Sequence, residues 1–278
     1  MKHHGLGVLS VLALGLAGCI NISSWKSVGG SGQVISEPRS VSQFHEVTLG
    51  GSGELSLVQG AEESLTIEAD DNLLPLIESE VSGGRLWIGW RNVNLRPSRT
   101  IHYTLHVKDL DTLNLSGSLT ARTGSLRADH MSISISGSGN IQIAKLEART
   151  VSAHISGSGD TRIAGEVEDQ KISISGSGSH HAADLRCHQA EAHISGSGRA
   201  TLWVKDSLTS AISGSGSINY FGHPSVSSHV SGSGRLHHLG DKQAPPGGAG
   251  NRAPWVAPLH RFSTFPVVLR QPVSNKLR

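Results

Sequence analysis

The feature that most constrains the fold is a five-residue phrase, ISGSG, which recurs at a nearly constant interval. Copies begin at residues 135, 155, 174, 194 and 212, and the related phrases LSGSL and VSGSG begin at 115 and 230. Neighbouring copies are therefore 18–20 residues apart. A flexible Ser-Gly linker has no reason to keep that interval, or to keep an apolar residue before each copy. A fixed period of this length indicates a repeat architecture.

Within one repeat, the apolar residues follow the period of a β-strand. In residues 135–154, Ile141 and Ile143 alternate with polar residues, and so do Val151 and Ala153. Three short strands per repeat match one coil of a parallel β-helix, in which stacked coils bury a continuous core. The sequence therefore predicts an all-β protein, a parallel β-helix (solenoid) with 18–20-residue coils.

The residue before each Ser-Gly-Ser-Gly corner is predicted to point into this core. Gly accommodates the positive φ of a tight bend, and Ser is small enough to stack on its copy in the next coil. Cys187 falls in a column of small residues and is expected to fill the core as a small hydrophobe. The predicted inward ladder consists of Leu115, Ile135, Ile155, Ile174, Ile194, Ile212 and Val230.

The N-terminus, residues 1–19, carries the pattern of a lipoprotein signal peptide. Residues 5–17 form an apolar run that is too short to span a bilayer. The run ends in Leu16-Ala17-Gly18-Cys19, which resembles the lipobox of bacterial lipoproteins, where the Cys is lipidated and becomes the mature N-terminus. Ile20, rather than Asp, follows the Cys, and the resemblance then implies the outer membrane. A plain secretory signal with a chance Cys is the alternative.

The remaining chain divides into three segments. Residues 20–35 are expected to form a flexible tether, and residues 36–240 the β-helix domain. Its first part, 36–114, is less regular and is predicted to supply the first coils and an N-terminal cap. Residues 241–278 hold six of the ten prolines and are expected to be mostly disordered, with one strand near 265–269.

Several stretches together resemble a known bacterial family. They are FHEVTLGGSGE at 44–54, LTIEADDNLLP at 65–75, GRLWI at 84–88 and the ISGSG series. The chain is similar to the head GIN domain family, labelled as auto-transporter adhesins, over roughly residues 40–240. The resemblance implies a right-handed β-helix in an exported envelope protein, and it implies no catalytic residues.

The composition and the repeats argue against several chemistries. A net charge of +2 gives no basis for nucleic-acid binding. The glycines lack the Lys-Ser/Thr of a phosphate loop, and no repeated carboxylate builds a calcium ladder. Three histidines at ladder-preceding positions, His154, His193 and His229, are expected to point outwards and too far apart to share one metal ion. No metal or other cofactor is therefore predicted.

The best-supported function is a non-catalytic binding, adhesin-like or structural role at the cell envelope. The membrane is the expected partner through lipid on Cys19, together with a polysaccharide or another envelope protein. Trp203 and Phe221 are predicted neighbours that could form a ligand platform, although packing explains them as well. A β-helix lyase or glycosidase is the enzymatic alternative. It requires two acids at fixed geometry, whereas those at 160–169 and 184 do not stack into a defined pair. A scaffold whose coils stack end to end is a third hypothesis.

Overall fold

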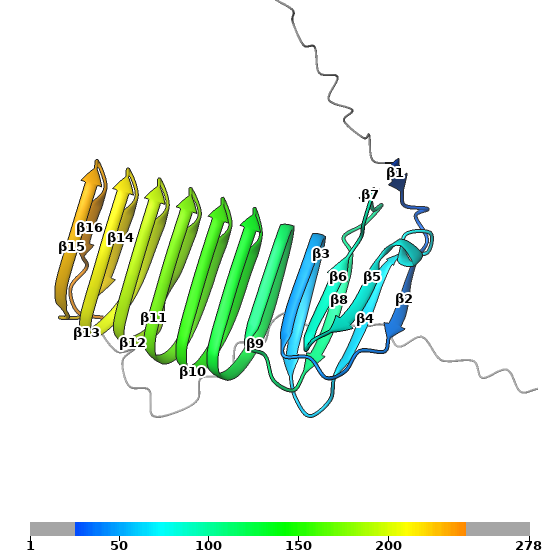
Figure 1. Cartoon of the computed structure of the whole chain (residues 1–278), viewed down its shortest axis with the longest axis horizontal. Helices are drawn as coiled ribbons and strands as arrows, with labels where there is room; N and C mark the ends of the chain where they lie inside the picture. Colours follow the sequence, from blue (N-terminus) through cyan, green and yellow to red (C-terminus); the bar gives the residue numbers. More distant parts are fainter. Residues whose placement is uncertain (1–25, 243–278) are drawn as a thin grey trace, which may run out of the picture. The chain divides into compact units, whose positions relative to one another are not determined.

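The computed structural model describes residues 26–242 and confirms the predicted parallel β-solenoid (Figure 1). Consecutive coils lie side by side, and equivalent residues pair from one coil to the next. Ile155, for example, pairs with Ile135 on one side and Ile174 on the other. The regular coils are built from β9 (Thr112–Gly137), β10 (Asn140–Gly157), β11 (Asp160–Gly176), β12 (Ser179–Gly196) and β13 (Arg199–Gly214).

Each regular coil carries one continuous strand assignment, but its pairing breaks at two bends into three straight segments, as the sequence predicted. In β10 these segments are residues 140–143, 146–148 and 150–157. The first bend is marked by a register shift, such as the one between Ile143 and Leu146. Gly165 lies at this bend with a φ of +132°. Parallel neighbours satisfy the backbone groups throughout, so the strand does not need to end there.

The C-terminal edge of the sheet is shorter. β14 (Ser217–Phe221) and β15 (Ser225–Gly232) both stack on β13, and β16 (Arg235–His238) starts a further coil by pairing with β14. Within the described chain, nothing stacks beyond β15 and β16. Val230 is correctly placed in the ladder, because it pairs with Ile212, but it is 41% exposed. Val230 therefore holds the predicted ladder position but is not buried, because no further strand stacks on β15.

The N-terminal part is the expected irregular cap, and it contains antiparallel pairs. β3 joins the cap to the coils by pairing in parallel with β9, and β4 runs antiparallel between β2 and β8. The cap elements are β1 (Lys26–Gly29), β2 (Val34–Arg39), β3 (Glu46–Gln59), β4 (Ser64–Asp70), the 3-10 turn η1 (Leu74–Leu76), β5 (Glu78–Ser82), β6 (Arg85–Gly89), β7 (Val93–Arg96) and β8 (His102–Val107).

Residues 26–35 are not a free tether, in contrast to the prediction for 20–35. β1 pairs with β7, and β2 begins at Val34 and pairs with β4. A buried carboxylate helps to hold this segment. Asp70 accepts hydrogen bonds from the Gly32 amide (2.8 Å) and from the Ser98 amide and hydroxyl (2.9 and 2.5 Å). Burial opposes ionisation, but these hydrogen bonds outweigh it and hold the pKa of Asp70 below its usual range.

The core is a largely apolar column inside the coils, interrupted by a few buried polar residues such as His180 and Gln170. The ladder residues from Leu115 to Ile212 are all buried, as the alternation predicted. At the corners, Gly157 has a φ of +121°, and a Cβ there would lie 2.4 Å from the Gly137 carbonyl oxygen. The corner glycine is therefore required both by its backbone conformation and by the close approach of the neighbouring coil.

Some predicted features lie outside the described residues. They are the signal peptide with Cys19, residues 20–25 of the tether, and all but the first two residues of the 241–278 segment, including the strand near 265–269.

Candidate functional site

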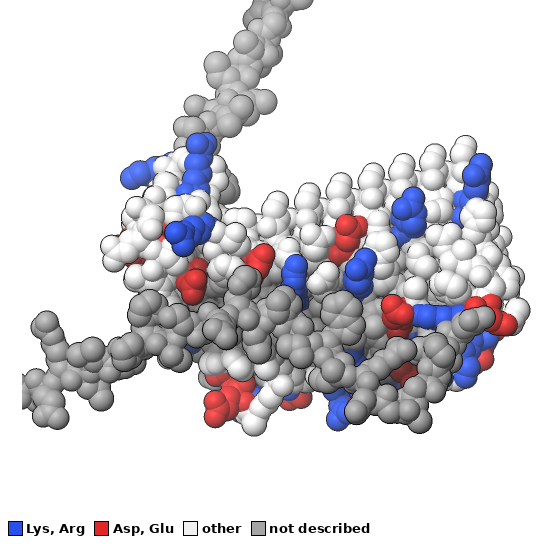
Figure 2. Space-filling model, turned by 180° about the vertical axis from the view of Figure 1, so that it is seen from behind, with Lys and Arg blue, Asp and Glu red and all other residues white. Residues whose placement is uncertain are grey.

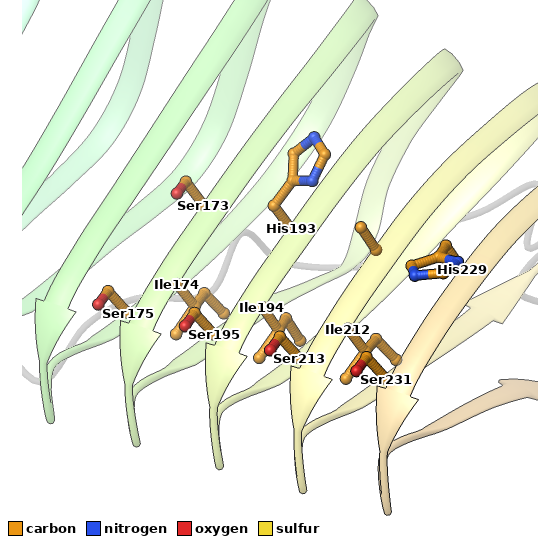
Figure 3. Close-up of a pocket in the computed structure, with 11 residues that line it drawn as sticks. Ser173, Ile174, Ser175, His193, Ile194, Ser195, Ile212, Ser213, His229 and Ser231 are labelled. Atoms are coloured by element: carbon orange, nitrogen blue, oxygen red, sulfur yellow. The ribbon is translucent and has the colours of Figure 1, made fainter.

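A shallow groove of about 390 Å³ runs across four coils beside the buried ladder (Figure 3). Its floor includes Ile174, Ile194 and Ile212. Small polar side chains flank them, with the corner serines on one side and the column that contains His193 on the other. The Ile floor and the corner serines repeat from coil to coil, whereas the other flanking column reads Ser173, His193, Ala211 and His229. The groove therefore offers repeated serine hydroxyls along a mainly apolar floor.

The histidines before the ladder point outwards, as predicted. His154, His193 and His229 are exposed, while their column neighbours are Ser or Ala. His193 Nε2 lies 2.8 Å from a Glu191 carboxylate oxygen. This hydrogen bond, with help from Lys171, lowers the pKa of Glu191. The outward histidines are thus part of a polar surface.

A second, more polar hollow of about 730 Å³ lies further back along the same limbs of the coils. It is lined by charged side chains, including Asp169, Lys171 and Glu191, and by neutral ones such as Thr150 and Gln189. Lys171 and Glu191 form an ion pair of 3.4 Å across adjacent coils. Open surfaces of this kind suit hydrogen-bonded contacts with a polar ligand.

The acidic residues that could serve in glycan cleavage are held in different surroundings. Glu166 forms an ion pair with Arg186, and Asp184 forms one with Lys242. Asp160 follows a corner, whereas Asp169 lies beyond the bend on the other limb of the same coil. Glycoside hydrolysis requires two carboxyl groups that face one another across the scissile bond, whereas Glu166 and Asp184 face basic partners and Asp160 and Asp169 lie on different limbs.

Trp203 and Phe221 are brought together as predicted. They are register partners on adjacent coils, and both are half-buried. The Lys242 ammonium lies 5.0 Å from the Trp203 ring centroid, so this aromatic face already has a cation partner. Trp87 and Trp90 belong to the N-terminal cap, where Arg91 stacks on Trp87 at 4.4 Å. The tryptophans therefore do not line one common groove.

The sequence interpretation missed a buried polar cluster around His180. His180 is fully buried, with Nδ1 2.5 Å from the Thr161 hydroxyl and Nε2 2.7 Å from the Gln170 amide nitrogen. The Gln170 amide donates to Nε2, so Nδ1 carries the proton and donates to Thr161. Burial lowers the pKa of His180 to about 3. Strand parity was the available signal, since Thr161 and His180 share an inward column.

Cys187 fills the core, as the register indicated. It is buried, pairs with Val167, and donates a weak hydrogen bond to the Trp203 carbonyl oxygen at 3.4 Å. Burial raises the pKa of the Cys187 thiol to about 12, which suppresses the reactive thiolate.

The described residues were compared with the structural requirements of a metal site and of a membrane-spanning helix. Across residues 26–242, no group of three or more His, Cys, Asp or Glu residues is arranged to hold a metal ion. The same part of the chain includes no helix with the length and apolar character needed to cross a membrane.

The fold and these repeated outward surfaces define a β-solenoid with an extended polar exterior. Residues 43–224 match the family model described as "Putative auto-transporter adhesin, head GIN domain". The chain belongs to this family. No curated protein matches it.

Three solved structures show the same architecture. A "putative lipid binding protein" from Parabacteroides distasonis ATCC 8503 is 26% identical, with a TM-score of 0.67 over 77% of this chain and 100% of that one. A "putative adhesin" from Bacteroides fragilis NCTC 9343 is 24% identical, with a TM-score of 0.72 over 76% and 100%. A "putative adhesin" from Parabacteroides merdae ATCC 43184 is 20% identical, with a TM-score of 0.61 over 77% and 99%. The latter two show the fold alone.

Proposed function

We propose that this protein is an exported, lipid-anchored envelope protein that binds an extended polymer along its coils without cleaving it. The observation that carries the proposal is the repetition of the outward surface. The groove beside the ladder crosses four coils, and a corner serine recurs in each of them. Such a surface offers many weak, similar contacts, which suit multivalent attachment. The names given to the relatives, as adhesins, agree with this role.

A non-catalytic role agrees with the chemistry of the surface. Catalysis would require groups held at fixed mutual geometry, whereas the acids of these coils are engaged in ion pairs or lie on different limbs. The relative described as lipid binding suggests another ligand class. However, the hollow of about 730 Å³ is lined mainly by Ser, Thr, Gln and charged side chains, which suit sugar hydroxyls better than acyl chains.

The binding role is tested by incubating the full chain, purified in mild detergent, with a panel of neutral and acidic envelope polysaccharides. We expect saturable binding and unchanged polymer length, measured by calorimetry and by size-exclusion chromatography of the recovered polymer. Shortening of any polymer in proportion to the amount of protein would contradict the non-catalytic proposal. Absence of binding across the whole panel would contradict the polymer-binding proposal.

The lipid anchor leads to a separate prediction. If Cys19 is the lipidated residue of Leu16-Ala17-Gly18-Cys19, Cys19→Ser removes the sulfur that carries the lipid. We expect the variant to lose incorporation of labelled palmitate in a Gram-negative host and to leave the membrane fraction. Cys187→Ser is the matched control, because Cys187 is the buried thiol. Equal labelling of wild type and Cys19→Ser would refute the anchor.

A further inference from the structure

A row of exposed arginines follows the Ser-Gly corners along the solenoid. It consists of Arg122, Arg162, Arg199 and Arg235, which we call the arginine row. Each of these residues is the first or the third after its corner, so all lie on the limb that leaves the corner. Figure 2, which views the solenoid from behind, shows blue side chains at intervals along the coils rather than in a single patch.

The arginines occur in every second coil. In one column, Gln142 lies between Arg122 and Arg162, and in the neighbouring column Ser217 lies between Arg199 and Arg235. Between Arg162 and Arg199 lies the coil with Ser179 and His181. Because coils are about 4.8 Å apart, successive arginines are separated by roughly 10 Å along the axis. Arg199 and Arg235 lie two residues nearer to their corners than Arg122 and Arg162 do. The second half of the row is therefore displaced sideways by roughly 7 Å.

The coils between the arginines offer uncharged hydrogen-bonding groups. Asn140 and Gln142 occupy the second coil of the series, and Ser217 and Asn219 occupy the sixth. Amides and hydroxyls of this kind donate to and accept from sugar hydroxyls. One carboxylate interrupts the row, because Asp160 lies two residues before Arg162 in the same coil.

The arginine row is free of ion pairs, whereas arginines near the bend of the coils are not. Among residues 26–242, none of the four forms a salt bridge, but Arg127 pairs with Glu147 at 2.6 Å and Arg149 with Asp129 at 3.0 Å. The chain thus neutralises its arginines on one part of the surface and leaves them available on another. Unpaired, regularly spaced cations favour an anionic partner of matching repeat.

A groove lies at the start of the arginine row. It has a volume of about 200 Å³ and is lined by Arg122, Arg162 and the amide side chains between them. Its floor includes Thr161, which is held from below by the buried His180. A second hollow, of about 570 Å³, lies next to it on the side of the N-terminal cap. Thr120 lines both hollows, and Arg99 lines the second. The first two arginines of the row, Arg122 and Arg162, therefore line a hollow in the surface.

We propose that the arginine row binds a linear acidic polysaccharide that carries one carboxylate per disaccharide. Successive guanidinium groups would meet successive carboxylates, because the two-coil interval is comparable to the length of one disaccharide in an extended chain. The intervening amides and hydroxyls would meet the neutral sugars. This inference rests on the proposed polymer-binding function, names its ligand class and adds the limb that leaves the corners to the binding surface.

Nucleic acid fits the same row less well. Duplex DNA presents a phosphate about every 3.4 Å along each strand, which is far denser than the arginine spacing. Single-strand binding sites also stack bases on aromatic side chains, whereas the lining of the groove at Arg122 contains no Phe, Tyr or Trp. A polysaccharide in which charged and neutral sugars alternate matches the alternation of arginine-bearing coils with coils that have no arginine in the row.

The test is calorimetric titration of the full chain with hyaluronan oligosaccharides, which alternate one uronate and one neutral sugar. We expect each Arg→Gln change in the row to weaken binding about 2–5-fold, as for an exposed charge contact, and Arg162→Gln with Arg199→Gln about tenfold. Asp160→Asn removes the repelling carboxylate, so it should strengthen binding about twofold. The control Arg127→Gln with Arg149→Gln removes the same charge elsewhere and should change affinity less than twofold.

Two comparison ligands, carboxyl-reduced hyaluronan and single-stranded DNA, separate the outcomes. Carboxyl-reduced hyaluronan should bind at least tenfold more weakly than hyaluronan. If both forms bind equally and the row variants have no effect, the arginine row is not the site, while polymer binding itself stands. If neither these nor any other polysaccharide binds, both proposals fail. Single-stranded DNA that binds more tightly than hyaluronan, and is lost in the same variants, would overturn the polysaccharide assignment. Unchanged circular dichroism of each variant excludes unfolding as the cause.

Discussion

Ile174→Asp is expected to lower the free energy of unfolding by about 4 kcal/mol or more, because it places an unpaired carboxylate in the core. Ile174 is 1% exposed and lies between Ile155 and Ile194 in the ladder. No neighbouring group is available to pair with the new charge within this apolar column. Urea unfolding followed by circular dichroism measures the change.

Two controls distinguish the inward position from the substitution itself. Ser175→Asp places the same group on the adjacent, exposed residue and should cost less than about 1 kcal/mol. Val230→Asp changes the same ladder column at the open end, where the side chain is 41% exposed, and should also have a small effect. A midpoint for Ile174→Asp equal to that of Ser175→Asp would disprove the inward assignment.

Gly157→Ala is expected to cost about 3 kcal/mol, although it adds only one methyl group. The φ of Gly157 is +121°, a conformation that L side chains rarely adopt, and this contributes strain of about 1–3 kcal/mol. The added Cβ would also lie 2.4 Å from the Gly137 carbonyl oxygen, so that two coils would have to separate. That oxygen accepts a 2.9 Å hydrogen bond from the Ser158 amide, which the separation would weaken.

Ser158→Ala is the matched control for the corner. Ser158 is exposed, and the substitution retains its backbone amide, so thermal unfolding should change by less than about 0.5 kcal/mol. Equal stability of Gly157→Ala and wild type would show that the corner does not need glycine.

The repeat register could be predicted from the sequence because one requirement recurs in every coil. The Ile of ISGSG must be buried, and each corner glycine must accept a positive φ next to the previous coil. These constraints leave a period that is visible without any structure. The cap could be predicted only in outline. β1 and β2 contain Ser, Lys, Glu and Pro and are ordered by pairing with β7 and β4, which lie far away in the sequence.

The polar features were harder to predict because they depend on relations between coils. His180 resembles any strand histidine until the register places it inward beside Thr161. The residues directly after the corners appear unpatterned when they are taken as one column. The alternation of the arginine row becomes visible only when the column two residues later is added, because Arg122 and Arg162 occupy one column and Arg199 and Arg235 the other.

The most direct test of the central claim, polymer binding along several coils without cleavage, is affinity as a function of ligand length. The full chain is titrated with a length series of acidic oligosaccharides, and each recovered ligand is weighed by mass spectrometry. We expect affinity to rise with each added disaccharide until the ligand spans the coils and then to level off, with every ligand recovered intact. A short oligosaccharide that binds as tightly as a long one, or recovery of shortened products, would contradict the account.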